Sequence, residues 1–190
     1  MSNSRGDFVE PHYLQHLSGG SDKDVILRDL MTQYGNDVWN FAFFLTRHAD
    51  AADDLTQDVF LSVYDKLYSF RGECSVKSWL LTITRNKSLN YLKSAFIRKV
   101  TLVDYVIRKG SSRSAEAELF DRLETRHIWA TLMRTPRKFR EILLLNAHYQ
   151  LTNKEISLLL EIPEATVKTR LHRARKKLSD MLNNDNQGGE

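Results

Sequence analysis

Six lysine and arginine side chains lie within ten residues near the carboxyl end of the chain, between Lys168 and Lys177. On a helical wheel, this segment has an apolar stripe made of Val167, Leu171, Ala174 and Leu178. The opposite arc carries the polar side chains that could reach a ligand, which are Lys168, Thr169, His172, Arg173 and Lys176. Such an arc suits phosphate neutralisation and hydrogen bonds to base edges in a major groove. The segment predicts DNA binding, and the plainer alternative is a solvated basic helix.

A shorter helix is predicted just before the basic one. Thr152 can cap a helix over residues 153–160, and Glu155 stands at the spacing of a capping box. Pro163 cannot continue that helix but fits the first turn of the next, so the corner falls at residues 161 and 162. Two helices with a tight corner predict a helix-turn-helix unit.

A second group of side chains has the composition that single-stranded nucleic acid requires. Cations and amides interleave with aromatic rings from residue 70 to residue 99. The candidate contacts are Phe70, Arg71, Gly72, Glu73, Cys74, Ser75, Trp79, Arg85, Asn86 and Asn90. The loop before Ser75 could wall a pocket for an extruded base. Trp79 has a strong alternative as a core residue, and Cys74 is better read as a small filler than as a redox sensor.

An acidic helix precedes that loop. Its predicted inner stripe is Leu55, Val59 and Val63, and its outer face carries Asp54, Gln57, Asp58, Leu61 and Asp65. An apolar Leu61 among carboxylates could anchor a basic partner helix. The alternative, with Leu61 tucked beneath a neighbouring helix, is equally open at this point.

Charge is divided unevenly along the chain. Residues 1–70 hold five Lys or Arg against eleven Asp or Glu, and the remainder holds 23 against 13. An acidic first third followed by a basic remainder suits two different partners, such as a protein and a nucleic acid.

The helical periodicity predicts an all-α fold with two small helical domains joined by a flexible linker, the second domain being a helix-turn-helix. The predicted segments are a tail over 1–23, a first domain over 24–96, a linker over 97–118, a second domain over 119–183 and a tail over 184–190. Within the first domain, Asp50 is expected to cap the acidic helix, and Ser75 to cap a helix ending near Ser94. Residues 25–45 read as one helix or as two that meet at Gly35.

Several classes of function find little support in the composition. The single Cys74 allows no intrachain disulfide and no thiolate zinc site, and no metal or cofactor is expected. His12 and His16 could share a metal only if the polar tail around them were a helix. No signal-peptide core or long apolar run is present, so a cytoplasmic protein without membrane insertion is expected. Without HExxH, Walker or GxSxG motifs, an enzyme is not expected.

These motifs together resemble a known family. DAADDLTQDVFLSVYDKLYSFRGECSVKSWLLTITRNKSLNYLK, residues 50–93, is similar to the core-binding and melting domain of bacterial extracytoplasmic-function sigma factors. LTNKEISLLLEIPEATVKTRLHRARKKL, residues 151–178, is similar to their DNA-reading domain. The resemblance implies that the acidic helix grips the clamp coiled coil of the largest subunit of core RNA polymerase, with the residues Asp53, Asp54, Gln57, Asp58 and Leu61. It also implies that residues 70–75 receive a flipped minus-ten base, with Trp79 and Asn86 on the helix behind.

The resemblance further implies that Lys168, Thr169, His172 and Arg173 read a minus-thirty-five element in duplex promoter DNA. Residues 97–118 would thread the polymerase active-site channel. An anti-sigma factor is a common partner in the family, although no residue here identifies one. The corner departs from the family pattern, because Glu161 and Ala165 stand where glycines are common. The sequence therefore does not indicate which bases of the minus-thirty-five element this domain prefers.

Two other functions compete with a sigma factor. A stand-alone helix-turn-helix transcription regulator would share the second domain, but it would ordinarily be a dimer with a ligand or phosphoacceptor domain. An adaptor that only binds another protein through Asp54 and Leu61 would share the first domain.

Overall fold

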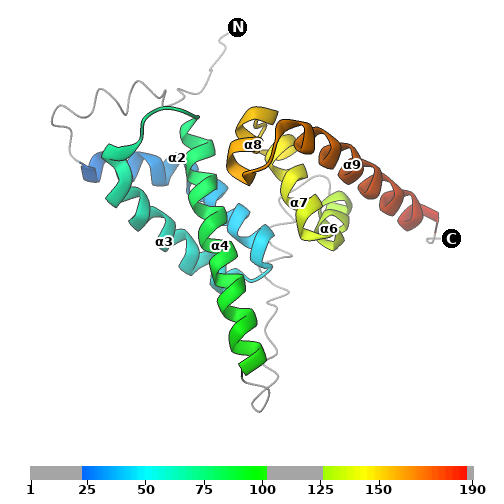
Figure 1. Ribbon diagram of the computed structural model, residues 1–190. Helices are drawn as coiled ribbons and strands as arrows, with labels where there is room; N and C mark the ends of the chain where they lie inside the picture. Colours follow the sequence, from blue (N-terminus) through cyan, green and yellow to red (C-terminus); the bar gives the residue numbers. More distant parts are fainter. Residues whose placement is uncertain (1–22, 102–125, 188–190) are drawn as a thin grey trace, which may run out of the picture.

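The computed structural model describes residues 23–101 and 126–187, and these residues form helices and turns without strands. The all-α fold class is therefore confirmed for this part of the chain. Figure 1 shows two groups of helices packed side by side, with the long green helix α4 extending beyond the rest of the first group. The amino-terminal tail and most of the linker predicted from the sequence fall outside the described residues.

The first group contains α2 (Lys23–Thr46), α3 (Ala49–Lys66), the short 3-10 turn η2 (Leu67–Ser69) and α4 (Val76–Thr101). Its apolar residues recur every three or four positions, which gives each helix one buried stripe. The stripes meet in a core of Ile26, Leu30, Tyr34, Val38, Val59, Phe60, Val63, Leu67, Val76 and Leu80. This core fixes the acidic helix α3 against the aromatic helix α4.

The ends of these helices differ in part from expectation. Helix α2 continues through Gly35 as one helix. The expected cap at Asp50 is wrong, because α3 begins at Ala49 and an extended His48 takes the cap position without a side-chain hydrogen bond. Asp50 lies instead in the first turn, where its charge interacts favourably with the helix dipole.

Helix α4 begins as expected and ends later than expected. The backbone N–H of Ser78 donates to the Ser75 hydroxyl at 3.2 Å, so Ser75 caps the helix. The helix then runs to Thr101 rather than stopping near Ser94. The amphipathic pattern fades in that stretch, but no glycine or proline interrupts it, and helical backbone geometry persists.

The second group contains α6 (Arg126–Arg134), α7 (Arg137–Leu143), the π-helical turn η3 (Leu144–His148), α8 (Asn153–Leu160) and α9 (Glu164–Gln187). Pro136 opens α7 from the cap position, as its fixed φ favours. The buried stripe of α9 consists of Val167, Leu171 and Ala174, with Leu178 half-buried. The predicted apolar stripe of the basic helix is therefore confirmed.

The corner between α8 and α9 has the predicted capping box. The Thr152 hydroxyl accepts from the Glu155 N–H at 3.2 Å, and the Glu155 carboxylate accepts from the Thr152 N–H at 2.9 Å. Glu161 then turns the chain with φ 56° and ψ 45°, in the left-handed region. The Ser157 hydroxyl donates to the Ile162 carbonyl at 2.6 Å and braces the corner.

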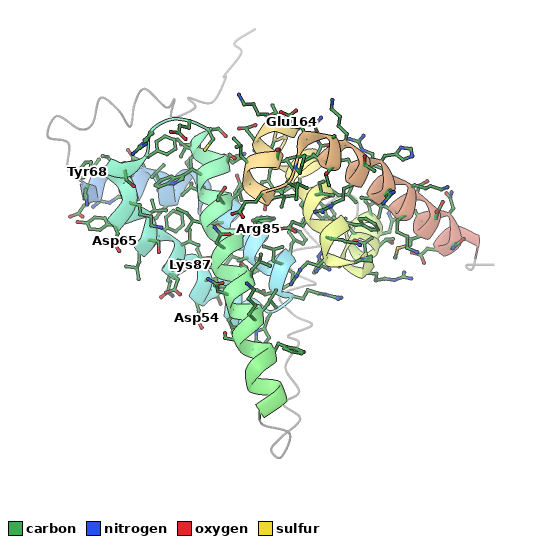
Figure 2. The ribbon with its side chains drawn as sticks, in the orientation of Figure 1. Asp54, Asp65, Tyr68, Arg85, Lys87 and Glu164 are labelled. Atoms are coloured by element: carbon green, nitrogen blue, oxygen red, sulfur yellow. The ribbon has the colours of Figure 1, made fainter. Side chains whose placement is uncertain are left out.

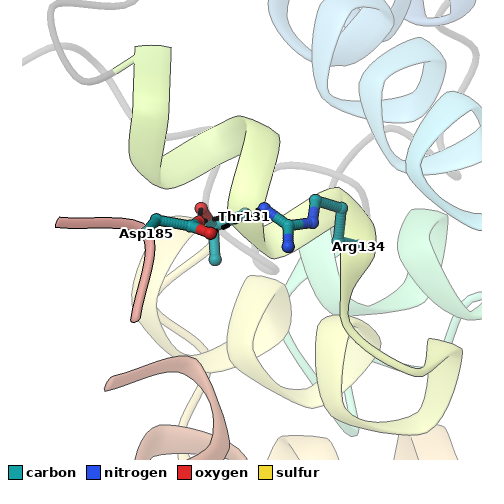
Figure 3. Close-up of polar contacts among 3 residues, drawn as sticks. All are labelled: Thr131, Arg134 and Asp185. Carbon is teal, nitrogen blue, oxygen red and sulfur yellow. Dashed lines mark hydrogen bonds and ion pairs between the residues drawn. The ribbon is translucent and has the colours of Figure 1, made fainter. Parts of the chain in front are cut away.

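The far end of α9 is tied to α6. Asp185 accepts hydrogen bonds at 3.0 Å from the Thr131 hydroxyl and from Arg134, as Figure 3 shows. These hydrogen bonds, from Arg134 first and Thr131 second, lower the pKa of the Asp185 carboxyl. The basic helix is thus held at its corner and again near its end.

The two groups share an apolar core. It contains Phe41, Ala42, Phe43, Phe44, Leu45, Ala52, Leu55 and Leu81 from the first group, together with fourteen buried residues from Leu132 to Ala174 in the second. The rings of Phe44 and Trp129 stack with centroids 5.2 Å apart, and Phe41 meets Tyr149 edge to face at 5.5 Å. The end of α2 is therefore buried between the two groups.

We predict that Glu161→Gly stabilises the protein. A left-handed residue with a Cβ costs roughly 1–2 kcal/mol, and glycine removes that cost while adding some unfolded-state freedom. A gain of about 1 kcal/mol in the free energy of unfolding is expected in urea titrations followed by circular dichroism. Glu161→Ala, which loses the charge but keeps the Cβ, is the control and should bring no such gain. Equal behaviour of the two variants would show that the corner is not strained.

Candidate nucleic-acid and protein interfaces

A small hollow lies where the loop after η2 meets the start of α4. Its volume is about 190 Å³, and its lining is Ser69, Phe70, Arg71, Glu73, Cys74 and Trp79. The Phe70 and Trp79 rings lie 4.9 Å apart between centroids, and Gly72 turns the loop with φ 69°. A drug-sized pocket has about 300–1,000 Å³, so this hollow suits one small planar group. The structure thus brings together most of the loop residues predicted from the sequence.

Trp79 combines the two roles that the sequence left open. It is half-buried and packs against the core of the first group, and it also lines the hollow. The core therefore holds the indole in place beside the hollow.

Cys74 is poorly suited to redox chemistry. Burial raises the pKa of its thiol, and the negative charges of Glu155 and Glu73 add to that effect against an opposing hydrogen bond with Ser78. Because the thiolate is the reactive form, a raised pKa keeps this side chain unreactive at neutral pH. The filler interpretation of Cys74 is the better supported one.

The amide side chains of α4 form a face that continues from the hollow. Asn86 follows Trp79 by seven residues and Asn90 follows by eleven, so all three project from the same side of the helix. Both asparagines are exposed. This face can meet a strand that leaves the hollow.

Arg85 does not join that face. Its guanidinium Nε lies 2.5 Å from Oε1 of Glu141 on α7, and the two side chains are only 17% and 6% exposed. Figure 2 shows Arg85 between α4 and the second group of helices. The residue predicted to contact DNA is therefore engaged in an ion pair between the two groups.

The outer face of α3 has the predicted composition. Asp53, Asp54, Gln57, Asp58 and Leu61 are all exposed, while Leu55, Val59 and Val63 are buried. Leu61 is 64% exposed, which excludes the interpretation that it is tucked beneath a neighbouring helix. Asp53 accepts a hydrogen bond from the Trp39 indole at 2.7 Å, which fixes its carboxylate. Figure 2 places Asp54 and Asp65 along this outer side.

The basic arc of α9 is open to solvent. Lys168, Thr169, His172, Arg173 and Lys176 are all exposed. Arg175, on the other side of the helix, donates to the Asn146 side chain at 2.8 Å. The five predicted side chains therefore form one free surface.

Glu155 links the helix-turn-helix to the cap of α4, and the sequence did not reveal this contact. One of its carboxylate oxygens serves the capping box, and the other accepts from the Ser75 hydroxyl at 2.6 Å. Burial alone would raise the pKa of Glu155, but hydrogen bonds from Ser75 and Thr152 lower it below its usual value. The capping-box pattern placed Glu155 on α8 but carries no signal for a partner eighty residues away.

A further contact missed from the sequence joins the groups near the start of α4. The Tyr149 hydroxyl donates to the Asp37 carbonyl at 3.0 Å, and the Asp37 carboxylate lies 3.2 Å from the Lys77 ammonium. These contacts position α4 against the turn that precedes α8.

Residues 23–101 and 126–187 contain no cluster of three His, Cys, Asp or Glu side chains suited to a metal, and His12 and His16 lie outside them. In the same residues, no helix combines the length and apolar character needed to cross a bilayer.

Comparisons with known proteins agree with this arrangement. Residues 30–95 match the family model Sigma-70 region 2, and residues 128–178 match Sigma-70, region 4. RNA polymerase sigma factor SigZ of Bacillus subtilis is 30% identical over 156 residues, with 82% of this chain and 86% of SigZ covered. ECF RNA polymerase sigma factor SigM of the same organism is 29% identical, with 84% of this chain and 96% of SigM covered.

A solved structure shows the same fold. The sigma factor RpoE, in complex with the anti-sigma factor NepR from Bartonella quintana, aligns with a TM-score of 0.68 at 22% identity, over 85% of this chain and 98% of that one. The two matched regions coincide with the two helix groups. The chain belongs to the bacterial extracytoplasmic-function sigma factors, which bind core RNA polymerase and direct it to promoters.

Proposed function

We propose that this sigma factor uses three separate surfaces to start transcription. The hollow beside Trp79 takes a flipped minus-ten base, the basic arc of α9 reads the minus-thirty-five element, and the outer face of α3 grips the polymerase. The observation that carries the proposal is the hollow itself, because a duplex-binding regulator has no use for a pocket of single-base size.

The hollow has the chemistry that an unstacked base needs. Phe70 and Trp79 supply ring faces for stacking, which contributes about 1–3 kcal/mol per base. Ser69, Arg71 and Glu73 bring polar groups that can meet the edge of a base. The exposed Asn86 and Asn90 then hold the neighbouring part of the single strand.

The outer face of α3 suits a basic helical partner. Leu61 provides an apolar anchor, and the surrounding carboxylates guide encounter and orientation. We assign this face to the clamp coiled coil of the largest polymerase subunit. The assignment rests on exposure, on charge and on the position of α3 within the sigma region 2 match.

The protein is proposed to act without catalytic residues of its own, in the cytoplasm where the polymerase operates. Synthesis of RNA belongs to the polymerase, and this chain contributes binding energy to promoter choice and strand opening. The related structures are complexes, RpoE with the anti-sigma factor NepR and CnrH with the cytosolic domain of CnrY. An anti-sigma factor for this chain is proposed on that likeness.

The decisive experiment is reconstitution. Core polymerase with and without the chain is incubated on genomic DNA, and the RNA start sites are mapped. New starts that share elements near minus ten and minus thirty-five are expected only when the chain is present. Identical start sites in the two samples would contradict the proposal.

We predict that Arg173→Ala weakens transcription from a promoter found in this way. The side chain lies on the free arc of α9, and loss of a good base contact costs about 1–3 kcal/mol. Holoenzyme affinity for promoter DNA measures the effect. Arg175→Ala removes the same charge from the other side of α9 and should have a smaller effect. Equal losses in the two variants would reduce the arc to a general electrostatic contribution.

We predict that Asp54→Lys combined with Asp58→Lys abolishes assembly with core polymerase. The double change replaces two exposed carboxylates with cations, which repel a basic partner. Co-elution with the core enzyme in size-exclusion chromatography reports assembly. Asp29→Lys combined with Asp180→Lys changes the net charge equally on other exposed surfaces and should leave assembly intact. Normal co-elution of the first pair would remove the assigned role of α3.

A further inference from the structure

One carboxylate on the outer face of α3 is held by a side chain from another helix. The indole Nε1–H of Trp39, on α2, donates to Oδ1 of Asp53 at 2.7 Å. Within residues 23–101 and 126–187, Asp54 and Asp58 have no side-chain hydrogen bond or ion pair. Asp53 therefore differs from these two neighbours, because its orientation is set before any partner arrives.

Trp39 is itself firmly held. Its ring stacks on the ring of Phe43, one turn further along α2, with the centroids 5.4 Å apart and the planes within 5° of parallel. Phe43 is only 3% exposed, and the half-buried Trp39 packs against the same apolar core. A tryptophan of this kind has an apolar body in the core and a polar N–H that needs a partner. The core therefore fixes the indole, and the indole fixes the carboxylate.

The hydrogen bond leaves Asp53 able to bind a partner. An ionised carboxylate has two acceptor oxygens, and the indole occupies one site on Oδ1. The indole is neutral, so the negative charge of Asp53 is not cancelled as it would be in an ion pair. Because the residue is exposed, its remaining acceptor sites are available to a cationic donor on another protein.

A side chain that is oriented beforehand loses less freedom on binding. Each side chain that an interface immobilises weakens association, and preorganisation removes part of that loss. Aspartate has only two rotatable side-chain bonds, so the expected benefit is modest, about two- to fivefold in affinity. Long-range attraction depends on charge, which is the same with or without the hydrogen bond. The benefit should therefore lie in slower dissociation rather than in faster association.

We infer that Trp39 is a positioning residue for polymerase binding, whose indole holds Asp53 in the orientation that accepts a cationic side chain of the partner helix. The inference rests on the proposed function of the outer face of α3, and it extends the residues that serve this face to α2. Trp39 acts through Asp53 and requires no contact of its own with the polymerase.

The first test observes the hydrogen bond in the free chain by proton NMR. The sequence contains three tryptophans, and the indole N–H signal that disappears in Trp39→Phe belongs to Trp39. Asp53→Asn replaces a charged acceptor with a neutral one and should shift that signal. Asp58→Asn is the control and should leave the signal in place. A Trp39 signal that does not move in Asp53→Asn overturns the inference.

The second test measures binding of the full chain to immobilised core polymerase by surface plasmon resonance. Trp39→Phe keeps an aromatic ring against Phe43 but loses the N–H donor. We expect the dissociation rate to rise about two- to fivefold and the association rate to change little. A dissociation rate equal to that of the unmodified chain overturns the inference.

A double-mutant cycle separates positioning from a general loss of stability in α2. Trp39→Phe combined with Asp53→Asn should dissociate no faster than Asp53→Asn alone, because the effect of Trp39 passes through Asp53. Trp39→Phe combined with Asp58→Asn is the matched control, and its effect should be the sum of the two single effects. If Trp39→Phe adds its full effect to Asp53→Asn, Trp39 has only a structural role and the inference fails.

Failure of the inference can be distinguished from failure of the proposed function. If Asp54→Lys combined with Asp58→Lys leaves assembly normal, the proposed function of the outer face of α3 fails. If that pair abolishes assembly while Asp53→Asn or Trp39→Phe dissociates like the unmodified chain, the face keeps its function and only the positioning role of Trp39 fails.

Discussion

The apolar core shared by the two domains is the constraint on which the other contacts depend. Phe41 and Phe44 near the end of α2 pack against Tyr149 and Trp129 of the second domain. Burial of one such side chain contributes about 1.5–3 kcal/mol. The ion pair of Arg85 with Glu141 joins the same two domains and is largely shielded from water, unlike a weak surface contact. A buried pair pays a desolvation cost, so its main effect is to define how the domains meet.

The sequence predicted local structure correctly where interactions between residues close in the sequence determine it. The capping box at Thr152, the corner before Pro163 and the buried stripe of α9 each depend on residues within a few positions of one another. The positions of the helix ends were harder to predict. Asp50 had the right chemistry for a cap but lies in the first turn of α3, and α4 continues beyond the stretch with an amphipathic pattern. Such ends depend on packing and propensity that a wheel does not show.

The sequence predicted which surfaces of the candidate site are exposed, but it did not predict which side chains pair with one another between the domains. Helical spacing predicted the exposed faces of α3 and α9, and the loop composition pointed to the residues that line the hollow. Nothing in the sequence paired Arg85 with Glu141 or Ser75 with Glu155, because both pairs join segments more than fifty residues apart. Such pairs depend on how the two domains pack together, and this packing produces no periodic pattern in the sequence.

The anchoring of Asp185 has a consequence for how α9 lies in a groove. The carboxylate is held about 18 Å along the axis from Arg173, at the rise of an ideal helix. A helix held at both ends has a preferred roll about its axis, so the bases that its arc can meet are decided partly by a contact remote from the nucleic acid. The contact itself is solvent-accessible and weak, which leaves the roll adjustable when a groove demands it.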